Sequence, residues 1–260
     1  MAQWRRKREK GGVRLPLFKE ILKAYYVAKK DMKIYYFTPP SLTWGIVLPV
    51  FLFLAFASGL RGSGDMQFLI PGLVGMTLLF STTSVEAVAI VFEKMEGTFE
   101  RLLLSPVSFK TIIFGKAMAG LSFGLLTASV VLILAVIFTG ISINSVFSLL
   151  TGIILSGLVF SAIGLTISVY VSKMWEAMAM ANFLRFPMVF ICGAFIPISS
   201  LPEALQWIAY FLPLTYSVDL IRWSLTGKSL FPNYIDMAAL ALYFLILWTI
   251  GIKALYKSLE

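Results

Sequence analysis

Long apolar stretches separated by short polar segments dominate the chain. A helix of about 20 apolar residues crosses the ~30 Å hydrocarbon core of a bilayer. The stretches lack the alternation of membrane β-strands, and an open strand edge in lipid would leave backbone groups unpaired. The pattern predicts an all-α integral membrane protein with six transmembrane helices, at residues 42–60, 68–92, 111–139, 146–171, 177–198 and 234–252.

Composition supports a membrane protein and excludes most catalytic chemistry. Hydrophobic residues make up 59% of the 260 residues and charged residues 13%, against roughly 25% charged in soluble domains. The absence of His and the single Cys, Cys192, exclude a Ser-His-Asp triad, a His-ligated metal and a disulfide within the chain. A P-loop is also excluded, because Arg222 stands where the glycine five residues before Gly227-Lys228-Ser229 is required. We therefore expect no enzyme activity and no cofactor, metal or ATP bound by this chain.

Gly120-Leu121-Ser122-Phe123-Gly124 has the G-x-S-x-G spacing of a serine nucleophile. No His is available to activate the serine, and the motif lies inside a predicted span. We expect instead that Gly120 and Gly124, four residues apart, let a second helix approach closely.

Lys and Arg are distributed unequally between the two ends of the predicted spans. Cytoplasmic loops carry the excess of these residues. One side holds only Arg61, Arg222 and Lys228, and Arg185 lies inside a span. The opposite side holds the other eighteen: Arg5, Arg6, Lys7, Arg8, Lys10, Arg14, Lys19, Lys23, Lys29, Lys30, Lys33, Lys94, Arg101, Lys110, Lys116, Lys173, Lys253 and Lys257. Both termini are therefore predicted to be cytoplasmic, which explains the net charge of +9 without nucleic-acid binding.

The chain is predicted to have two parts: a basic cytoplasmic segment, residues 1–40, and a transmembrane domain, residues 41–260. In the first part, residues 16–36 carry an apolar stripe at helical spacing with lysines elsewhere. Such a basic amphipathic helix lies along the cytoplasmic membrane surface, either as an anchor alone or also in contact with a cytoplasmic partner. The stripe consists of Phe18, Ile21, Leu22, Tyr25, Ala28, Met32 and Tyr35.

The cytoplasmic segment between the second and third spans predicts a short helix. Thr98 is its expected N-cap, Glu100 suits its first turn and Pro106 stops it. Two turns with three leucines are too short to fold alone, so the helix docks either into a partner protein or against the chain's own spans. The candidate docking residues are Glu93, Glu96, Gly97, Thr98, Phe99, Glu100, Arg101 and Leu102.

The outer connection before the last span, residues 201–233, is too apolar for a soluble loop. Pro202 is expected to start one short helix, Pro213 to break it, and Thr215 to cap a second that ends near Gly227. We expect a re-entrant helical hairpin in the outer leaflet, with Asp219 and Arg222 paired on one helix face. The candidate residues of this hairpin are Trp207, Pro213, Tyr216, Asp219 and Arg222.

Two charges are predicted within spans, Glu86 in the second and Arg185 in the fifth. Intramembrane charges are costly and are candidates for function. Their similar depth favours an ion pair between them, and contact with a solute or proton transfer is the alternative.

Residues 93–106, with Glu96-Gly97-Thr98-Phe99-Glu100-Arg101-Leu102, resemble the cytoplasmic segment of type-2 ABC exporter permeases. A second stretch resembles the same family, in particular its drug-resistance and nodulation-factor exporter branch. That stretch runs from Phe190-Ile191-Cys192-Gly193-Ala194-Phe195-Ile196-Pro197 through Leu212-Pro213-Leu214-Thr215-Tyr216 to Arg222. Arg185 and Glu86 are not charged positions expected in that family pattern.

The resemblance implies a permease subunit of the cell membrane that exports an amphiphilic, drug-like or lipid-linked solute. It implies pairing with a second permease subunit and with a separate cytoplasmic ATPase, which holds ATP and Mg and contacts the docking helix. It also suggests that spans two and five line the route. Phe195, near the outer end of span five, is our candidate for an apolar constriction of that route, and ordinary helix packing is the alternative. An ion-coupled secondary transporter is the alternative, supported only by Glu86 and Arg185, and an integral-membrane enzyme is a weaker one.

Overall fold

The structure, a computed structural model, describes residues 17–59 and 65–257, and every regular element in these two ranges is a helix. Six of the basic residues predicted to be cytoplasmic lie outside the described residues: Arg5, Arg6, Lys7, Arg8, Lys10 and Arg14. The elements in chain order are α2 (Leu17–Asp31), η1 (Met32–Tyr36), α3 (Pro39–Leu42), η2 (Thr43–Val47), α4 (Leu48–Gly59), α5 (Asp65–Met95), α6 (Thr98–Leu104), α7 (Phe109–Thr139), α8 (Val146–Tyr170), α9 (Met174–Ile191), η3 (Ile198–Ser200), α10 (Glu203–Tyr210), α11 (Pro213–Thr226) and α12 (Asn233–Lys257).

The described ranges contain five helices that are long and apolar enough to cross a membrane. They are Pro39–Phe56, Met66–Met95, Phe109–Thr139, Val146–Tyr170 and Asn233–Lys257. These five coincide with predicted spans one to four and six. The remaining predicted span falls on α9, an 18-residue helix that carries Glu176, Asn182 and Arg185 and is not among the five.

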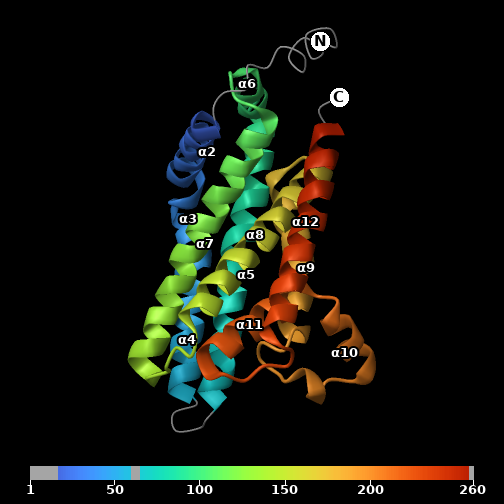
Figure 1. Cartoon of the computed structure of the whole chain (residues 1–260). Helices are drawn as coiled ribbons and strands as arrows, with labels where there is room; N and C mark the ends of the chain where they lie inside the picture. Colours follow the sequence, from blue (N-terminus) through green and yellow to red (C-terminus); the bar gives the residue numbers. More distant parts are fainter. Residues whose placement is uncertain (1–16, 60–64, 258–260) are drawn as a thin grey trace.

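α5 is the central helix of the bundle. In its most apolar stretch, 83% of α5 is buried inside the bundle. The corresponding share is 17% for α12 and 18% for the first candidate span. Figure 1 shows α5 surrounded by α7, α8 and α9, with α12 packed on α8 and the short helix α11 beneath them. α2 and the last turns of α12 lie at the same end of the bundle as α6.

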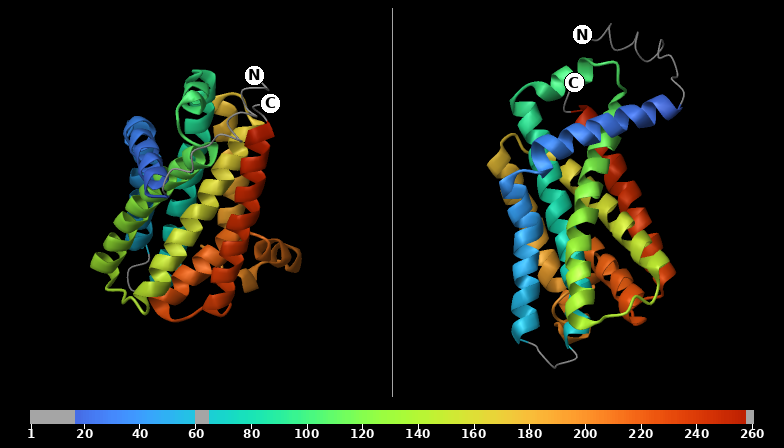
Figure 2. Two further views of the ribbon diagram at one scale, coloured as in Figure 1. Left: turned by 45° about the horizontal axis from the view of Figure 1, so that its top comes forward. Right: turned by 90° about the vertical axis from the view of Figure 1, so that its left-hand side faces the viewer.

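α2 lies across the long helices rather than along them, as the right-hand view of Figure 2 shows. It packs against α7 and continues into the π-helical turn η1, which ends at the buried Tyr36. A second π-helical turn, η2, interrupts the first candidate span. The predicted single helix over residues 16–36 is therefore an α-helix from Leu17 that changes to a wider turn after Asp31.

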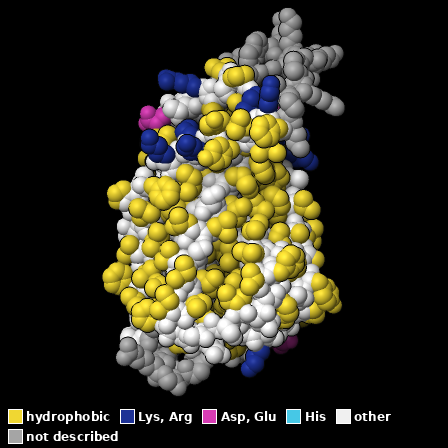
Figure 3. Space-filling view, turned by 60° about the vertical axis from the view of Figure 1, so that its left-hand side comes forward, with side chains coloured by type: hydrophobic (Ala, Val, Ile, Leu, Met, Phe, Trp, Pro, Cys, Tyr) yellow, Lys and Arg dark blue, Asp and Glu magenta, His cyan; other side chains and the backbone are white. Residues whose placement is uncertain are grey.

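Apolar side chains cover the middle of the molecule, and charged side chains gather near its ends. Figure 3 shows this on one face, where Lys and Arg side chains lie around the end that carries α2 and α6. Exposed aromatic residues on several elements contribute to the apolar surface: Phe51, Phe147, Phe183 and Phe190. A bilayer is the solvent that matches such a surface.

Two glycines of the bundle allow close approach between elements. A Cβ at Gly124 of α7 would lie 2.6 Å from Thr82 Cγ2 of α5, and one at Gly72 of α5 would lie 2.4 Å from the carbonyl oxygen of Ala194. The predicted role of Gly124 in helix packing is confirmed. At Gly120 the neighbours are polar, with Glu86 Oε2 at 3.0 Å and Tyr36 Oη at 3.2 Å from the built Cβ.

The predicted fifth span, 177–198, is too long at its end. α9 stops at Ile191, because Gly193 adopts a left-handed conformation with φ of 80° and Pro197 follows. A glycine of this kind directly after a helix is a common terminator. The chain then passes through η3 into α10.

Candidate functional site

α6 extends beyond the bundle at the end where α12 ends (Figure 1). Its N-cap is Gly97, with φ of 65°, so the prediction that Thr98 caps the helix is wrong. The Thr98 hydroxyl instead donates a hydrogen bond to the Glu93 carbonyl, 3.2 Å away. The helix ends at Leu104, before Pro106, as predicted.

One face of α6 is anchored to the bundle and the other is exposed. Phe99 is fully buried in a small apolar cluster formed with residues of α5, α7, α8 and α12. Glu100, Arg101 and Leu104 are exposed, and Leu104 retains 66% of its accessible surface. The alternative that this helix packs against the chain's own spans holds for its Phe99 face, and docking to a partner stays a prediction.

A buried cluster of four charges joins α2 to α5 and α7. The ammonium of Lys116, on α7, lies 2.6 Å from Glu93 Oε2 and 3.0 Å from Asp31 Oδ2. Lys30 pairs with Asp31 Oδ1 at 2.9 Å and forms a short contact with Glu93. Lys116, Glu93 and Asp31 are each only 1% exposed. Two positive and two negative charges thus compensate one another, three of them away from water and Lys30 at the partly exposed edge of the cluster.

Further contacts attach α2 to the segment that follows α6. Lys23 donates a hydrogen bond to the Pro106 carbonyl over 2.6 Å, and the Thr111 hydroxyl bonds to the Glu20 carboxylate. Pro106 and Thr111 lie immediately after α6 and at the start of α7. α2 therefore contacts the chain after α6, through Pro106 and Thr111, as well as before it, through Glu93 at the end of α5.

The sequence did not predict Asp31, Lys30 or Lys116 as site residues, and it predicted Glu93 only as a docking residue. A signal for the cluster is present, because Lys116 lies inside an apolar helix and Glu93 at the inner end of another. Charges in such positions need partners. The missing information was that α2 packs against α7 at this depth.

Glu86 and Arg185 do not form the predicted ion pair. Glu86 accepts a hydrogen bond of 2.9 Å from the Tyr36 hydroxyl and faces Gly120 of α7 and Gly164 of α8. Arg185 donates to the carbonyl oxygens of Ala181 and Phe80. The two charges are therefore held on different sides of α5.

A cavity of about 440 Å³ lies between α5, α9 and the segment that precedes α4. Its wall is mostly apolar, with Val85, Val88 and Phe186 among the lining residues, and Arg185 and Asn182 lie at its polar part. The volume falls in the range of roughly 300–1,000 Å³ that is typical of small-molecule sites. This is the candidate site for a solute.

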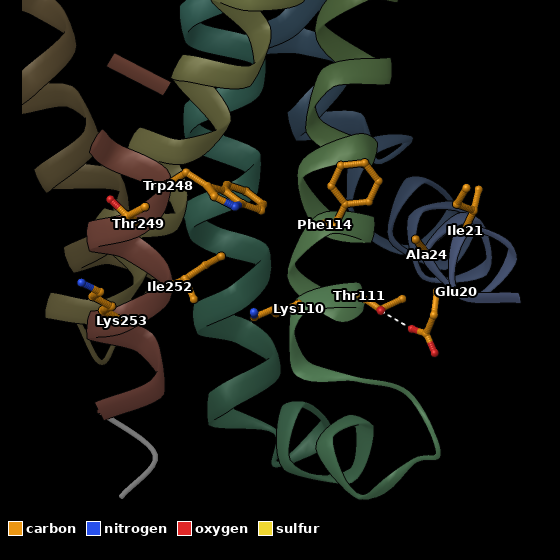
Figure 4. Close-up of a pocket in the computed structure, with 10 residues that line it drawn as sticks. All are labelled: Glu20, Ile21, Ala24, Lys110, Thr111, Phe114, Trp248, Thr249, Ile252 and Lys253. Carbon is orange, nitrogen blue, oxygen red and sulfur yellow. Dashed lines mark hydrogen bonds between the residues drawn. The ribbon is translucent and has the colours of Figure 1, made fainter. Parts of the chain in front are cut away.

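A second, more open hollow of about 740 Å³ lies between α2, the start of α7 and the end of α12. Figure 4 shows Phe114 and Trp248 on opposite walls of this hollow, and the contact of Thr111 with Glu20 at one side. Lys110 and Lys253 also line it. In the part of the chain that the structure describes, neither lysine forms an ion pair.

The opposite end of the molecule carries the two short helices of the predicted hairpin. α10 begins after Pro202 and ends at Tyr210, before Pro213, as predicted. α11 begins at Pro213 with Leu212 as its N-cap, so the prediction that Thr215 caps the second helix is wrong. The Thr215 hydroxyl donates to the Ala209 carbonyl, and that of Tyr216 to the Tyr210 carbonyl. These two bonds hold α10 and α11 together.

Asp219 and Arg222 are paired only loosely, with 3.8 Å between Oδ1 and Nη1. Asp219 instead accepts backbone N–H groups of Leu230 and Phe231, while Arg222 donates to the Gly193 carbonyl over 2.7 Å. Burial raises the pKa of the Asp219 carboxyl, although these amides act in the opposite direction. Both side chains therefore fasten loops to α11.

Two candidate residues of the outer end differ in exposure. Trp207 of α10 is 63% exposed. Phe195 is half-buried and packs on Phe56 of α4, with 5.7 Å between ring centroids. Within one chain, Phe195 thus joins the end of α9 to α4.

These features define a multi-pass helical membrane protein with a projecting helix and buried charges at one end and a closed helical hairpin at the other. The chain belongs to the ABC-2 type transporter family, whose sequence profile matches residues 23–226. The family resemblance found in the sequence is therefore confirmed.

Individual relatives support the same assignment. Inner membrane transport permease YadH from Escherichia coli (strain K12) is 25% identical over 82% of this chain and 85% of that protein. Nodulation protein J from Bradyrhizobium diazoefficiens is 30% identical over 62% of each chain. ABC transporter G family member 20 from Dictyostelium discoideum is 28% identical over 63% of this chain, which corresponds to 23% of that protein.

Proposed function

We propose that this chain is the membrane-spanning subunit of an exporter driven by ATP, which a separate cytoplasmic ATPase hydrolyses. The observation that carries the proposal is α6, which is anchored by Phe99 and presents Glu100, Arg101 and Leu104 outward. Membership of the ABC-2 family supports it. The sequence offers no P-loop, so the nucleotide is assigned to the partner.

In this proposal six helices cross the cell membrane, with α9 as the fifth, and both termini are cytoplasmic. The apolar side chains of α9, of which Phe183 is 73% and Phe190 61% exposed, suit lipid or a second subunit. α2 lies at the cytoplasmic surface, and α10 with α11 forms a hairpin in the outer leaflet. A second permease subunit completes the transporter.

α6 is suited to transmit movement of the ATPase. It follows α5 through Gly97 and leads into α7 within four residues, so its displacement acts on both helices. α2 moves with them, because Lys23 bonds to the Pro106 carbonyl and Lys116 links Asp31 of α2 to Glu93 of α5. Movement of α5 changes the shape of the cavity between α5 and α9. In this proposal, ATP hydrolysis uses that change to drive an amphiphilic solute outward.

The test is to weaken the docking surface without disturbing the bundle. The double variant Glu100→Ala with Arg101→Ala removes two exposed charges of α6. We expect normal membrane insertion but at least about tenfold weaker co-purification of the ATPase, the effect of losing one or two charge-assisted contacts. Gly97→Pro is the stronger variant, because proline cannot adopt the φ of 65° found there.

The matched control is Glu203→Ala with Lys228→Ala, an exposed acid and base at the opposite end of the molecule. This control is expected to bind the ATPase like the wild type. Undiminished ATPase binding and ATP-dependent transport in both α6 variants would contradict the proposal.

A further inference from the structure

Arg185 is a buried cation that has no compensating anion among the described residues. Its side chain lies in the bundle with 3% exposure, and its guanidinium carbon is 4.4 Å from the centroid of the Phe80 ring. Its hydrogen-bond acceptors are all neutral: the carbonyls of Ala181 and Phe80, the hydroxyl of Ser84 and the amide of Asn182. Neutral acceptors reduce the cost of burying a charge but leave the charge itself.

The nearest carboxylate along α5 does not serve as the partner. Glu86 is only two positions from Ser84, and residues two apart on an α-helix do not face the same side. Accordingly Ser84 contacts Arg185 while Glu86 contacts Tyr36. Within residues 17–59 and 65–257, Arg185 forms no ion pair with any Asp or Glu.

One donor of Arg185 remains available. A guanidinium has five N–H groups, and Arg185 uses Nε once, Nη1 twice and Nη2 once. The remaining N–H is on Nη2, and the Arg185 side chain lines the cavity of about 440 Å³. The cavity therefore combines a cationic N–H that is not used within the described residues with a largely apolar wall.

The rest of the cavity wall favours a molecule with an apolar tail. Phe186, Val88 and Met178 line it together with the ring of Phe92. The α5 residues that line the cavity, from Phe80 to Phe92, lie in the half of this helix nearer to α6, which is the cytoplasmic half in the proposed orientation. An amphiphile can thus place its head at Arg185 and its chain along the apolar wall, which extends from Arg185 toward the end that carries α6.

We infer that the cavity between α5 and α9 binds an anionic amphiphile, with Arg185 as the counter-ion of its head group. The inference rests on the proposed function and narrows its solute to the anionic class. An anionic membrane lipid and an exported anionic solute share this chemistry. The experiment below separates these two sources.

The experiment measures binding of fluorescent probes to the purified complex with its ATPase in phosphatidylcholine nanodiscs. The probes are NBD-labelled dodecyl sulfonate and the neutral NBD-labelled dodecyl alcohol. The wild type is expected to prefer the sulfonate. Arg185→Gln should weaken sulfonate binding about tenfold, as the loss of one charge-assisted bond does, and leave alcohol binding within about twofold. Arg185→Lys, which keeps the charge, should restore most of the preference.

The alcohol controls for misfolding, because a collapsed cavity would lose both probes. Equal loss of both probes in Arg185→Gln, or equal wild-type affinity for the two probes, would overturn the inference. The same holds if the double variant Lys110→Gln with Lys253→Gln loses the preference instead, because the anion would then bind in the hollow of Figure 4.

Two further measurements separate the sources. Competition by phosphatidylglycerol added to the nanodiscs, without ATP-dependent uptake of the sulfonate into inside-out vesicles, identifies a resident lipid. Vanadate-sensitive uptake identifies an exported solute. Both results support an anionic site. The proposed function is tested independently by ATPase binding to α6, so a failure of one is distinguishable from a failure of the other.

Discussion

Lys116 illustrates how one residue joins three elements of this protein. It lies on α7, and its ammonium contacts carboxylates from α2 and α5. A buried charge group of this kind adds little net stability compared with apolar packing, but removing one partner leaves an uncompensated charge. The cluster therefore acts as a specific attachment of α2 rather than as a large source of stability.

We predict that Lys116→Met destabilises the protein by about 3–5 kcal/mol, the usual cost of removing one partner of a buried pair. The reason is that Asp31 and Glu93 would then share only Lys30. The double variant Lys116→Met with Glu93→Gln should recover part of the loss, because one negative charge is removed as well. Thermal unfolding in detergent measures both.

Lys110→Met is the matched control, since this exposed lysine lies on the same helix and is expected to change stability by less than about 0.5 kcal/mol. Simple additivity of Lys116→Met and Glu93→Gln would show that the two residues do not interact.

At the residue scale, the sequence identified which charges are unusual but not their partners. Glu86 and Arg185 are both buried in the bundle, yet the predicted ion pair between them is wrong. Helix hydropathy fixes depth, whereas pairing depends on how each helix is rotated about its axis. Ser84 rather than Glu86 is rotated toward α9, and no apolar run reveals that.

At the element scale, apolar runs predicted the long helices well because lipid requires length and hydrophobicity. They could not predict where helices change character. The π-helical turns η1 and η2 lie inside runs of ordinary composition. α9 ends early because of Gly193, although the apolar sequence continues to Ile198. Caps were predicted by residue type, so Thr98 and Thr215 were chosen over Gly97 and Leu212.

One contact between elements gives a direct test of packing. The Cβ of Gly72→Ala would lie 2.4 Å from the Ala194 carbonyl oxygen, and backbone cannot move aside as a side chain can. We predict a loss of about 1–3 kcal/mol, as for other overpacked sites. Melting of the purified protein in detergent, followed by circular dichroism, measures it.

Gly152→Ala is the comparison, because its new Cβ would meet only the Leu220 side chain, at 3.1 Å. A smaller effect is expected there. Equal melting temperatures for the wild type and Gly72→Ala would mean that α5 and the segment after α9 are not tightly packed.

At the scale of the whole molecule, the exposed apolar face of α9 is a candidate contact with a second copy of the chain. We predict that Phe190→Cys, in a Cys192→Ala background, forms a disulfide between two subunits and blocks transport. Phe190 is 61% exposed and precedes Phe195, the candidate constriction. Non-reducing electrophoresis of membranes, with transport before and after reduction, provides the measurement.

Leu245→Cys on α12 is the control, since this residue is 59% exposed on another helix. Crosslinking at Leu245 but not at Phe190, in an active protein, would place the subunit interface on α12 instead.

The four-charge cluster also constrains the order in which the protein is made. The ribosome delivers Lys30 and Asp31 long before their partners, since Lys116 follows Asp31 by 85 positions and Glu93 follows Lys30 by 63. Until the third long helix has been made, α2 lacks Lys116 and can pair with the rest of the chain only through Lys30 and Glu93 of α5. The first helix therefore completes its contacts late in folding. A chain that stalls or is cut before Lys116 keeps α5 but loses both the Lys116 contacts and the packing of α2 against α7, and so exposes an unfinished subunit to membrane proteases.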